Sequence, residues 1–402
     1  MMHPFGVQAG VLQIGGVDLR RLAARAGHTP FYVYDRSLLD ARIRALRQTL
    51  PHGIELHYSI KANPMPAMVH HLAARLDGFD VASAGEMMLA LDAGTRPERI
   101  GFAGPGKSHD ELRRAVAAGV IIHIESATQL RLVTALGWEF GVRPCVAIRV
   151  NPDFQIGKGG MRMGGGAAPF GVDASLVPAL LLELARQEVA FAGFHVFWGS
   201  QCLHAPTIVQ AHRQSAELVM RLADNLEVPP AFINLGGGFG IPYFPGEDPL
   251  DLDAVGKAMH DWLPGLHQCL PGTRVVLELG RYLVGEAGIY VCRVVDRKVS
   301  CGETFLITDG GLHHHLAASG NFGQVLRRNY PVLIGNRLDE PAQEHSHVVG
   351  CLCTPLDRIA DDAHLPATSI GDLVVVLQSG AYGRSASPTD FLAHPPPAEM
   401  LV

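Results

Sequence analysis

Lys61 stands where an apolar segment ends, and its chemistry is the first feature of the chain that needs an explanation. It follows the alternating run Ile54–Ile60, which Asn63-Pro64 stops, so this run is expected to form a buried strand. An amine beside a buried strand is costly unless it is used, and a neutral amine can attack a carbonyl carbon to form an imine. The ordinary alternative is a lysine that extends from the strand end into water.

Other polar residues also stand at the ends of apolar segments. They are Asp80, Ser83, Arg149, Asn151, His195, Ser200, Asn234, Glu278 and Arg281, together with the glycines Gly236, Gly237 and Gly238. In a closed barrel of parallel strands, the functional face is built from the C-terminal ends of the strands. Polar groups with unrelated structural roles would be scattered, so this recurrence indicates a functional site.

Two of these features suit a phosphorylated aromatic ligand. The glycine-rich run Gly236–Gly240 follows a strand and would let backbone N–H groups approach a phosphate, to which Arg281 could add a charge. Glu278 could keep a ring nitrogen protonated and so make an aromatic ring an electron sink. Each feature has an ordinary alternative, a tight turn for the glycines and a strand-end salt bridge for Glu278.

His195 completes this set of groups. Its neighbours Phe194 and Phe197 suit a flat ring that stacks on another ring, although a histidine in such a segment is ordinarily a hydrogen-bonded core residue. An amine, a phosphate cradle, a carboxylate for a ring nitrogen and a stacking imidazole together describe a site for pyridoxal 5'-phosphate (PLP).

A regular alternation of strands and helices must position these residues. Strands are expected at residues 54–60, 79–83, 100–103, 120–124, 145–150, 192–197, 231–235 and 274–279. Eight strands that alternate with helical stretches predict an α/β fold, a parallel (β/α)8 TIM barrel rather than an open sheet. We assign residues 36–281 to this PLP-binding barrel.

After Arg281 the pattern becomes that of an all-β domain. Residues 290–299 alternate like an antiparallel strand, and short strands are expected at 304–308, 348–350 and 373–377. The aromatic segment 31–34 could join them. We therefore assign residues 1–35 and 282–402 to a β-barrel-like second domain.

The chain resembles, over nearly its whole length, the fold-type III PLP-dependent decarboxylases, the family of diaminopimelate, ornithine and arginine decarboxylases. Tyr58–Asn63 is similar to the family's Schiff-base lysine motif, and Asp80–Glu86 to the segment that supplies acidic residues near this lysine. Glu278–Arg281 is similar to the segment with the ring-nitrogen glutamate and the phosphate arginine, although the family usually has proline where Leu279 stands. The resemblance implies these cofactor-binding residues: Lys61, Asp80, Arg149, His195, Ser200, Gly236, Gly237, Gly238, Glu278, Gly280, Arg281 and Tyr382.

The resemblance also implies a homodimer with shared active sites. Cys351–Asp357 resembles the loop that reaches into the neighbouring subunit, and the match makes Cys353 the acid that protonates the α-carbon of the substrate. Tyr382 matches the tyrosine that contacts the phosphate. With Lys61 as the imine former, the catalytic residues are then Lys61, His195, Glu278 and Cys353.

The substrate-binding residues depart from the family pattern. Relatives that act on diamino or guanidino acids have an acidic residue after the loop cysteine, whereas this chain has Thr354. A buried distal ammonium would be left unpaired at a cost of a few kcal/mol, unless Asp357 substitutes. Free diaminopimelate, ornithine or lysine decarboxylation is therefore the alternative, and we expect an aminoacyl or otherwise derivatised amino acid as the substrate.

Further motifs resemble a subgroup that includes exosortase-associated decarboxylases and an enzyme acting on a glutamyl group on an acyl-carrier protein. These motifs are Asp309–His315 and Gly350–Pro355. The subgroup implies a substrate that could be tethered to an acyl or peptidyl carrier protein. Arg327 could meet a phosphopantetheine or a substrate carboxylate, although a solvated basic pair with Arg328 is the more ordinary interpretation.

No metal is expected, because adjacent histidines such as His313–His315 would alternate between the two faces of a strand. Three other functions fit the sequence less well. A PLP racemase of this fold needs a second base, commonly a tyrosine, where Cys353 stands. A non-catalytic PLP carrier lacks the second domain. A sugar-phosphate barrel enzyme with an imine-forming lysine gives no role to Glu278, His195 and Cys353 together.

The composition excludes several classes of partner. The 402 residues carry a net charge of −6 without a lysine- and arginine-rich tract, so no nucleic acid is expected. No uncharged run reaches about 18 residues, so no membrane span is expected. The seven cysteines lack a disulfide-like pattern and the N-terminus lacks signal-peptide features, which together favour the cytoplasm.

Overall fold

The computed structural model describes residues 3–156, 161–224, 226–324 and 326–402, and the chain divides into two compact units. One unit comprises residues 43–241 and 248–282, and the other comprises residues 1–42, 242–247 and 283–402. The exact domain boundaries and the completion of the site across a dimer stay predictions.

The first unit is built on a closed barrel of eight parallel strands. The strands are β5 (Ile54–Ser59), β6 (Gly78–Val81), β7 (Ile100–Phe102), β8 (Ile121–Ile124), β9 (Cys145–Asn151), β12 (Ala190–Val196), β14 (Phe232–Asn234) and β15 (Arg274–Leu279). Each strand pairs with the next in this order, and the pairing of β15 with β5 closes the ring. The predicted (β/α)8 barrel is confirmed.

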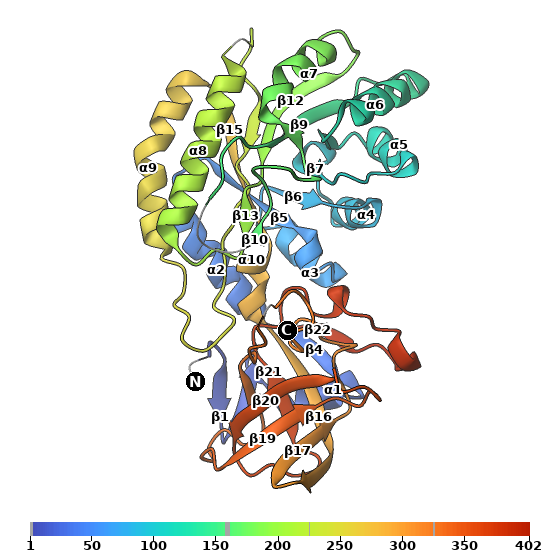
Figure 1. Cartoon of the computed structure of the whole chain (residues 1–402), viewed down its shortest axis with the longest axis vertical. Helices are drawn as coiled ribbons and strands as arrows, with labels where there is room; N and C mark the ends of the chain where they lie inside the picture. The colour runs from blue at the N-terminus through green and yellow to red at the C-terminus, as the bar shows by residue number, and fades with distance from the viewer. Residues whose placement is uncertain (1–2, 157–160, 225, 325) are drawn as a thin grey trace. The chain divides into compact units, whose positions relative to one another are not determined.

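Helices connect the barrel strands and lie outside them (Figure 1). They are α2 (Arg36–Thr49), which begins in the other unit, α3 (Pro66–Ala73), α4 (Ala84–Asp92), α5 (His109–Ala118), α6 (Ala127–Phe140), α7 (Val177–Leu184), α8 (Ala205–Ala223), α9 (Leu252–Cys269) and the short α10 (Arg281–Val284). Their starts follow local chemistry. The side chains of Ser83, Ser108 and Ser126 cap α4, α5 and α6 by accepting a hydrogen bond from an N–H of the first turn.

Small additions complete this unit. Single turns η1 (Ile60–Ala62), η2 (Pro97–Arg99) and η3 (Ala174–Leu176) lie in the connections, β11 (Val172–Asp173) adds to the edge of β9, and β10 (Met161–Arg162) pairs with β13 (Gly199–Ser200). Of these, η1 matters most because it carries Lys61 directly after β5.

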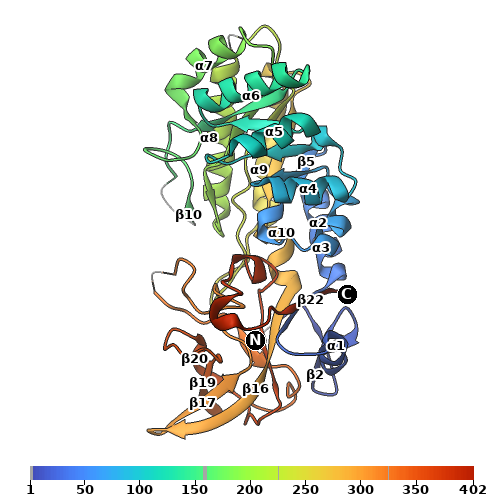
Figure 2. The ribbon, with the colours of Figure 1, turned by 90° about the vertical axis from the view of Figure 1, so that its right-hand side faces the viewer.

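The second unit contains a mixed β-sheet. Its strands are β4 (Phe31–Tyr34), β16 (Gly288–Ser300), β17 (Glu303–Thr308), β18 (Val332–Ile334), β19 (Glu344–Val349), β20 (Arg358–Leu365), β21 (Leu373–Val376) and β22 (Ala398–Leu401). Strands β16 and β17 form a long hairpin (Figure 2). The aromatic strand β4 lies between β16 and β22, as the sequence suggested for residues 31–34.

An apolar core holds this second unit together. Strand β2 (Val11–Ile14) and helix α1 (Leu19–Ala26) pack there with β4, β16 and β21, and Val17 of β3 (Val17–Asp18) lies against them. Strand β1 (Gly6–Gln8) pairs with β2 but is exposed. Single turns η4 (Gly285–Ala287), η5 (Arg384–Ala386) and η6 (Phe391–Ala393) lie in its connections.

No described helix in either unit combines the length and the apolar character that would let it span a membrane.

Candidate active site

The carboxylate of Glu278 is the centre of a polar cluster at the C-terminal ends of the barrel strands. Its Oε1 accepts a hydrogen bond from the Ser59 hydroxyl (2.9 Å) and lies 3.9 Å from Nζ of Lys61. Its Oε2 lies 3.2 Å from Nε2 of His195. The Glu278 side chain is 4% exposed and that of Lys61 is 43% exposed, so a buried acid stands beside an amine that a ligand can reach.

Two buried carboxylates of this region differ in their electrostatics. Burial alone would raise the pKa of Glu278, but the adjacent His195 and the positive charge of Lys61 outweigh it and hold this pKa well below its ordinary value. Burial and the negative charge of Glu278 raise the pKa of Asp80. Glu278 is thus the stronger acid of the two. Glu278 is therefore the carboxylate suited to stabilise a protonated ring nitrogen.

Both ring nitrogens of His195 lie close to polar side chains, with a hydrogen-bond contact at Nδ1. Its Nδ1 lies 2.9 Å from Nδ1 of His123, and the rings of the two histidines meet edge to face. Burial lowers the pKa of His123 well below its ordinary value, so His123 is neutral. With Nε2 directed at Glu278, the His195 ring is fixed in orientation. This is compatible with the predicted stacking role and with a hydrogen-bonded core histidine alike.

The glycine turn after β14 has the properties of an anion cradle. The Asn234 side chain accepts a hydrogen bond from the N–H of Gly236 (2.8 Å), and Gly236 and Gly238 have φ values of 67° and 81°. A Cβ at Gly237 would overlap the carbonyl oxygen of Glu278. Among the described residues, the buried N–H groups of Gly237 and Gly238 find no hydrogen-bond acceptor. Consecutive open N–H groups of this kind fit a phosphate.

Arg149 and Lys61 face the same aromatic ring. The Phe197 ring lies 5.4 Å from Nζ of Lys61 and 5.9 Å from the Arg149 guanidinium. Arg149 also donates a hydrogen bond to Glu125 (3.1 Å), which neutralises its charge. The other predicted cofactor residues of this unit lie at the same end of the barrel: Ser200 in β13, and Gly280 and Arg281 directly after β15.

The sequence did not predict a partly buried ionic network inside the barrel. His57, on β5, lies between the carboxylates of Asp80 (3.6 Å from Nδ1) and Glu55 (3.8 Å from Nε2). Glu55 in turn accepts hydrogen bonds from Arg99 (2.6 Å) and Arg274 (2.8 Å). The alternation of Glu55 and His57 with apolar residues was the available signal, because alternate positions of a barrel strand point inward.

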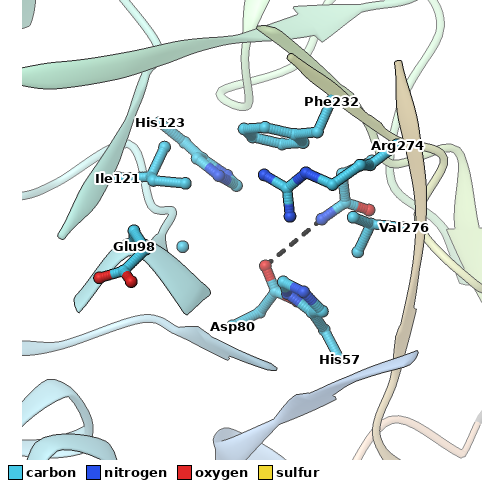
Figure 3. A pocket seen from close by; sticks show the side chains of 10 residues that line it. His57, Asp80, Glu98, Ile121, His123, Phe232, Arg274 and Val276 are labelled. Carbon is cyan, nitrogen blue, oxygen red and sulfur yellow. Dashed lines mark hydrogen bonds and ion pairs between the residues drawn. The ribbon is translucent and has the colours of Figure 1, made fainter. Parts of the chain in front are cut away.

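The interior of the barrel around this network is nearly filled. Figure 3 shows side chains from several strands converging, with the hydrogen bond from Asn234 to Asp80 among them. The cavity that they enclose has a volume of about 10 Å³, roughly the room that one water molecule needs. A cofactor cannot occupy this space, which leaves the face that carries Lys61, Glu278 and the glycine turn.

The remaining predicted residues belong to the second unit. Cys353 and Thr354 lie in an exposed turn after β19, and Tyr382 has a φ of 53° in the segment after β21. Arg327 is paired with Asp361 (2.9 Å) and also donates a hydrogen bond to the carbonyl of Arg358 (2.9 Å).

Asp357 is buried, and its carboxylate forms hydrogen bonds within the second unit. Its two oxygens accept hydrogen bonds from the N–H groups of Leu312 (2.6 Å) and Leu352 (2.8 Å). This geometry anchors the turn that carries Cys353. A role of Asp357 in substrate binding stays a prediction.

Comparison with known proteins agrees with this geometry. Residues 36–285 match the family "Pyridoxal-dependent decarboxylase, pyridoxal binding domain". The chain is 40% identical to the L-glutamyl-[BtrI acyl-carrier protein] decarboxylase of Niallia circulans, over 93% of this chain and 88% of that protein. It is 33% identical to the diaminopimelate decarboxylase of Methanothermobacter thermautotrophicus, over 98% and 91% of the two chains. The crystal structure of AQ1208 from Aquifex aeolicus covers 99% of this chain and 92% of its own, with a TM-score of 0.84 and 28% identity.

The chain therefore belongs to the pyridoxal-dependent decarboxylases. It is a PLP-dependent amino-acid decarboxylase, and the predicted family, enzyme class and cofactor are confirmed. The buried acid beside the reachable amine, and the open N–H groups of the glycine turn, fit this cofactor.

Proposed function

We propose that this enzyme decarboxylates a derivatised α-amino acid, such as an aminoacyl group on a carrier protein, at a site shared by two subunits. The observation that carries the substrate class is the neutral Thr354 next to Cys353. The 40% identical relative, which acts on an L-glutamyl group on an acyl-carrier protein, supports the same class.

The barrel residues would hold the cofactor and control its charge. When bound, PLP supplies an aromatic ring that accepts the electron pair left on the α-carbon as CO2 departs. Nζ of Lys61 would hold it covalently until the substrate amine takes its place. The N–H groups of Gly237 and Gly238, with Arg281, would bind the phosphate, and ionised Glu278 would hold a proton on the ring nitrogen.

Cys353 would supply the last proton. Its exposed thiol donates a proton to the α-carbon, which has lost its bond to the carboxylate, and the product is the corresponding amine. In the proposed dimer, this thiol comes from the neighbouring subunit.

The second unit offers little to a free diamino acid. Thr354 and Pro355 carry no charge, and the nearest carboxylate in the turn, Asp357, is engaged with two backbone N–H groups. A distal ammonium buried beside them would be unpaired. A substrate whose distal group is neutral or leads to a carrier avoids this cost.

The test is decarboxylation by the PLP-loaded enzyme of free L-amino acids and of the same amino acids as thioesters on carrier proteins. We expect CO2 release from derivatised substrates and at least about ten-fold lower kcat/KM for free lysine, ornithine and diaminopimelate. Lys61→Ala is the inactive control. Efficient turnover of a free diamino acid would overturn the proposal and favour the diaminopimelate decarboxylase alternative.

A matched pair of variants tests the role of Thr354. Thr354→Glu adds a carboxylate, and Thr354→Ser keeps the neutral hydroxyl. We expect only Thr354→Glu to improve the ratio of kcat/KM values for free over derivatised substrates. An equal ratio in the two variants would remove Thr354 from the argument.

A further inference from the structure

Three distant segments of the second unit bring a cysteine and two histidines together. His313 follows β17, Cys351 follows β19, and His394 follows η6. One ligand atom from each residue lies within 4.8 Å of the others, and Sγ of Cys351 is 3.9 Å from Nε2 of His394. None of these residues has a role in the proposed reaction.

His313 provides independent evidence for a ligand. Its side chain is completely buried, and neither ring nitrogen has a hydrogen-bond partner among the described residues. Its neighbours differ, because Nε2 of His314 contacts the carbonyl of Pro395 (2.9 Å) and Nε2 of His315 contacts the Ser379 hydroxyl (2.9 Å). A buried imidazole with two open nitrogens is costly unless something binds it.

The expected absence of a metal depended on a strand that is not formed. His313–His315 lie in a turn rather than on a strand, so the alternation of faces does not apply to them. The cluster also uses only one of these three histidines. Its other members come from the cysteine-containing turn and from the C-terminal segment.

The chemistry of the three groups suits a borderline-soft divalent ion. Both ring nitrogens of the buried His313 lack a hydrogen-bond partner among the described residues, so either can ligate. Burial and the negative charge of Asp357 raise the pKa of the Cys351 thiol to about 11, but a coordinating metal deprotonates a thiol outright. One thiolate and two imidazoles are ligands that Zn²⁺ prefers, with a fourth position open to water.

We propose that His313, Cys351 and His394 form a binding site for a Zn²⁺-like metal ion. Cys351 stands two residues before Cys353, so the ion would fix the base of the turn that carries the predicted acid. The ion would hold this turn in place together with the hydrogen bonds from Leu312 and Leu352 to Asp357.

The first test is the zinc content of PLP-loaded, tag-free protein after dialysis against a weak chelator. We expect about one equivalent per chain in the unaltered protein and about a tenth of that or less in Cys351→Ser and His394→Ala. Cys301→Ser is the matched control, because Cys301 is an exposed thiol elsewhere in the same unit. Zinc content that is equal in Cys351→Ser and Cys301→Ser, or absent from the unaltered protein after zinc loading, would overturn the proposal.

A second measurement distinguishes the loss of a metal ligand from misfolding of the variant. Co²⁺ loaded into the unaltered protein should give the near-ultraviolet thiolate-to-cobalt absorption, and zinc should abolish it by displacement. The band should persist in Cys301→Ser and vanish in Cys351→Ser whose PLP absorbance and circular dichroism are normal. Cobalt binding without a thiolate band in the unaltered protein would contradict the proposed ligands.

Discussion

His57 shows how a single buried side chain connects charge to stability. Burial would lower its pKa, but the carboxylates of Asp80 and Glu55 outweigh burial and raise the pKa to about 9. The ordinary value of 6.5 applies to the unfolded chain. The stabilisation from protonated His57 is thus fully present below about pH 6.5, and it is lost as the pH rises through about 9.

We predict that His57→Gln lowers the free energy of unfolding near pH 6 by about 2 to 3 kcal/mol, because Asp80 and Glu55 lose their buried cation. The difference from the unaltered protein should narrow above about pH 9, where His57 is neutral in both states. Urea unfolding of the PLP-loaded proteins at several pH values measures this, with the exposed His52→Gln as control. A difference that is independent of pH would show that His57 is neutral in the folded protein.

The sequence revealed some of the polar residues at strand ends and missed others. Lys61, His195 and Glu278 could be identified because a reactive group at the end of an apolar run is conspicuous, and the structure brings these three together. His123 and Glu125 were not singled out, since their partners come from other strands. The contacts between His123 and His195, and between Glu125 and Arg149, depend on barrel closure, which no local pattern specifies.

At the scale of elements, the turn Gly236–Gly238 has two roles. It forms part of the proposed cofactor-binding face, and it packs closely against β15, the strand that neighbours β14. Gly237 has no room for a Cβ because the backbone of Glu278 occupies that space. The same close approach places the turn beside the strand that carries Glu278. The glycine is thus required for packing, whichever ligand the turn binds.

Gly237→Ala should therefore destabilise the protein by at least about 2 kcal/mol and weaken PLP retention, because strand β15 must shift. Gly265→Ala is the matched control, since Gly265 lies in α9 and a Cβ there meets no atom within 4 Å. This control should be neutral or stabilising by up to about 1 kcal/mol. Thermal unfolding with and without PLP measures both effects, and equal melting temperatures for the two variants would contradict the packing argument.

Local features of the sequence explain why some elements were not predicted from it. Helix α9 contains Pro264 and two glycines, which ordinarily argue against a helix. Strand β20 carries Asp361, Asp362 and His364, which interrupt its apolar pattern. The eight barrel strands were predictable because each is a short apolar run between turn signals.

At the scale of the molecule, the predicted site residues are divided between the two units. An experiment must therefore decide whether one site combines residues of a single subunit or of two. Lys61 and Glu278 belong to the barrel unit, and Cys353 belongs to the other. If one subunit's Cys353 serves its partner's Lys61, a mixed dimer of two inactive variants contains one intact site.

We predict that Lys61→Ala and Cys353→Ser subunits, mixed in equal amounts under exchange conditions, recover about one quarter of the unaltered activity. Half of the dimers are then mixed, and each has one functional site of two. Lys61→Ala mixed with the double variant Lys61→Ala, Cys353→Ser is the control, and it should recover nothing. Mass spectrometry establishes that mixed dimers form, and their inactivity would show that each site is built within one subunit.

The position of β4 between β16 and β22 has a consequence for how the protein is made. Residues 31–34 leave the ribosome before any barrel strand, yet both neighbours of this strand, residues 288–291 and 398–401, are synthesised after the barrel. The N-terminal segment must therefore wait, with an apolar, aromatic strand unpaired, until residues 288–291 of β16 have been made. Both pairings of β4 are complete only after residues 398–401 are synthesised, and nascent chains that stall before residue 398 would expose an edge prone to aggregation.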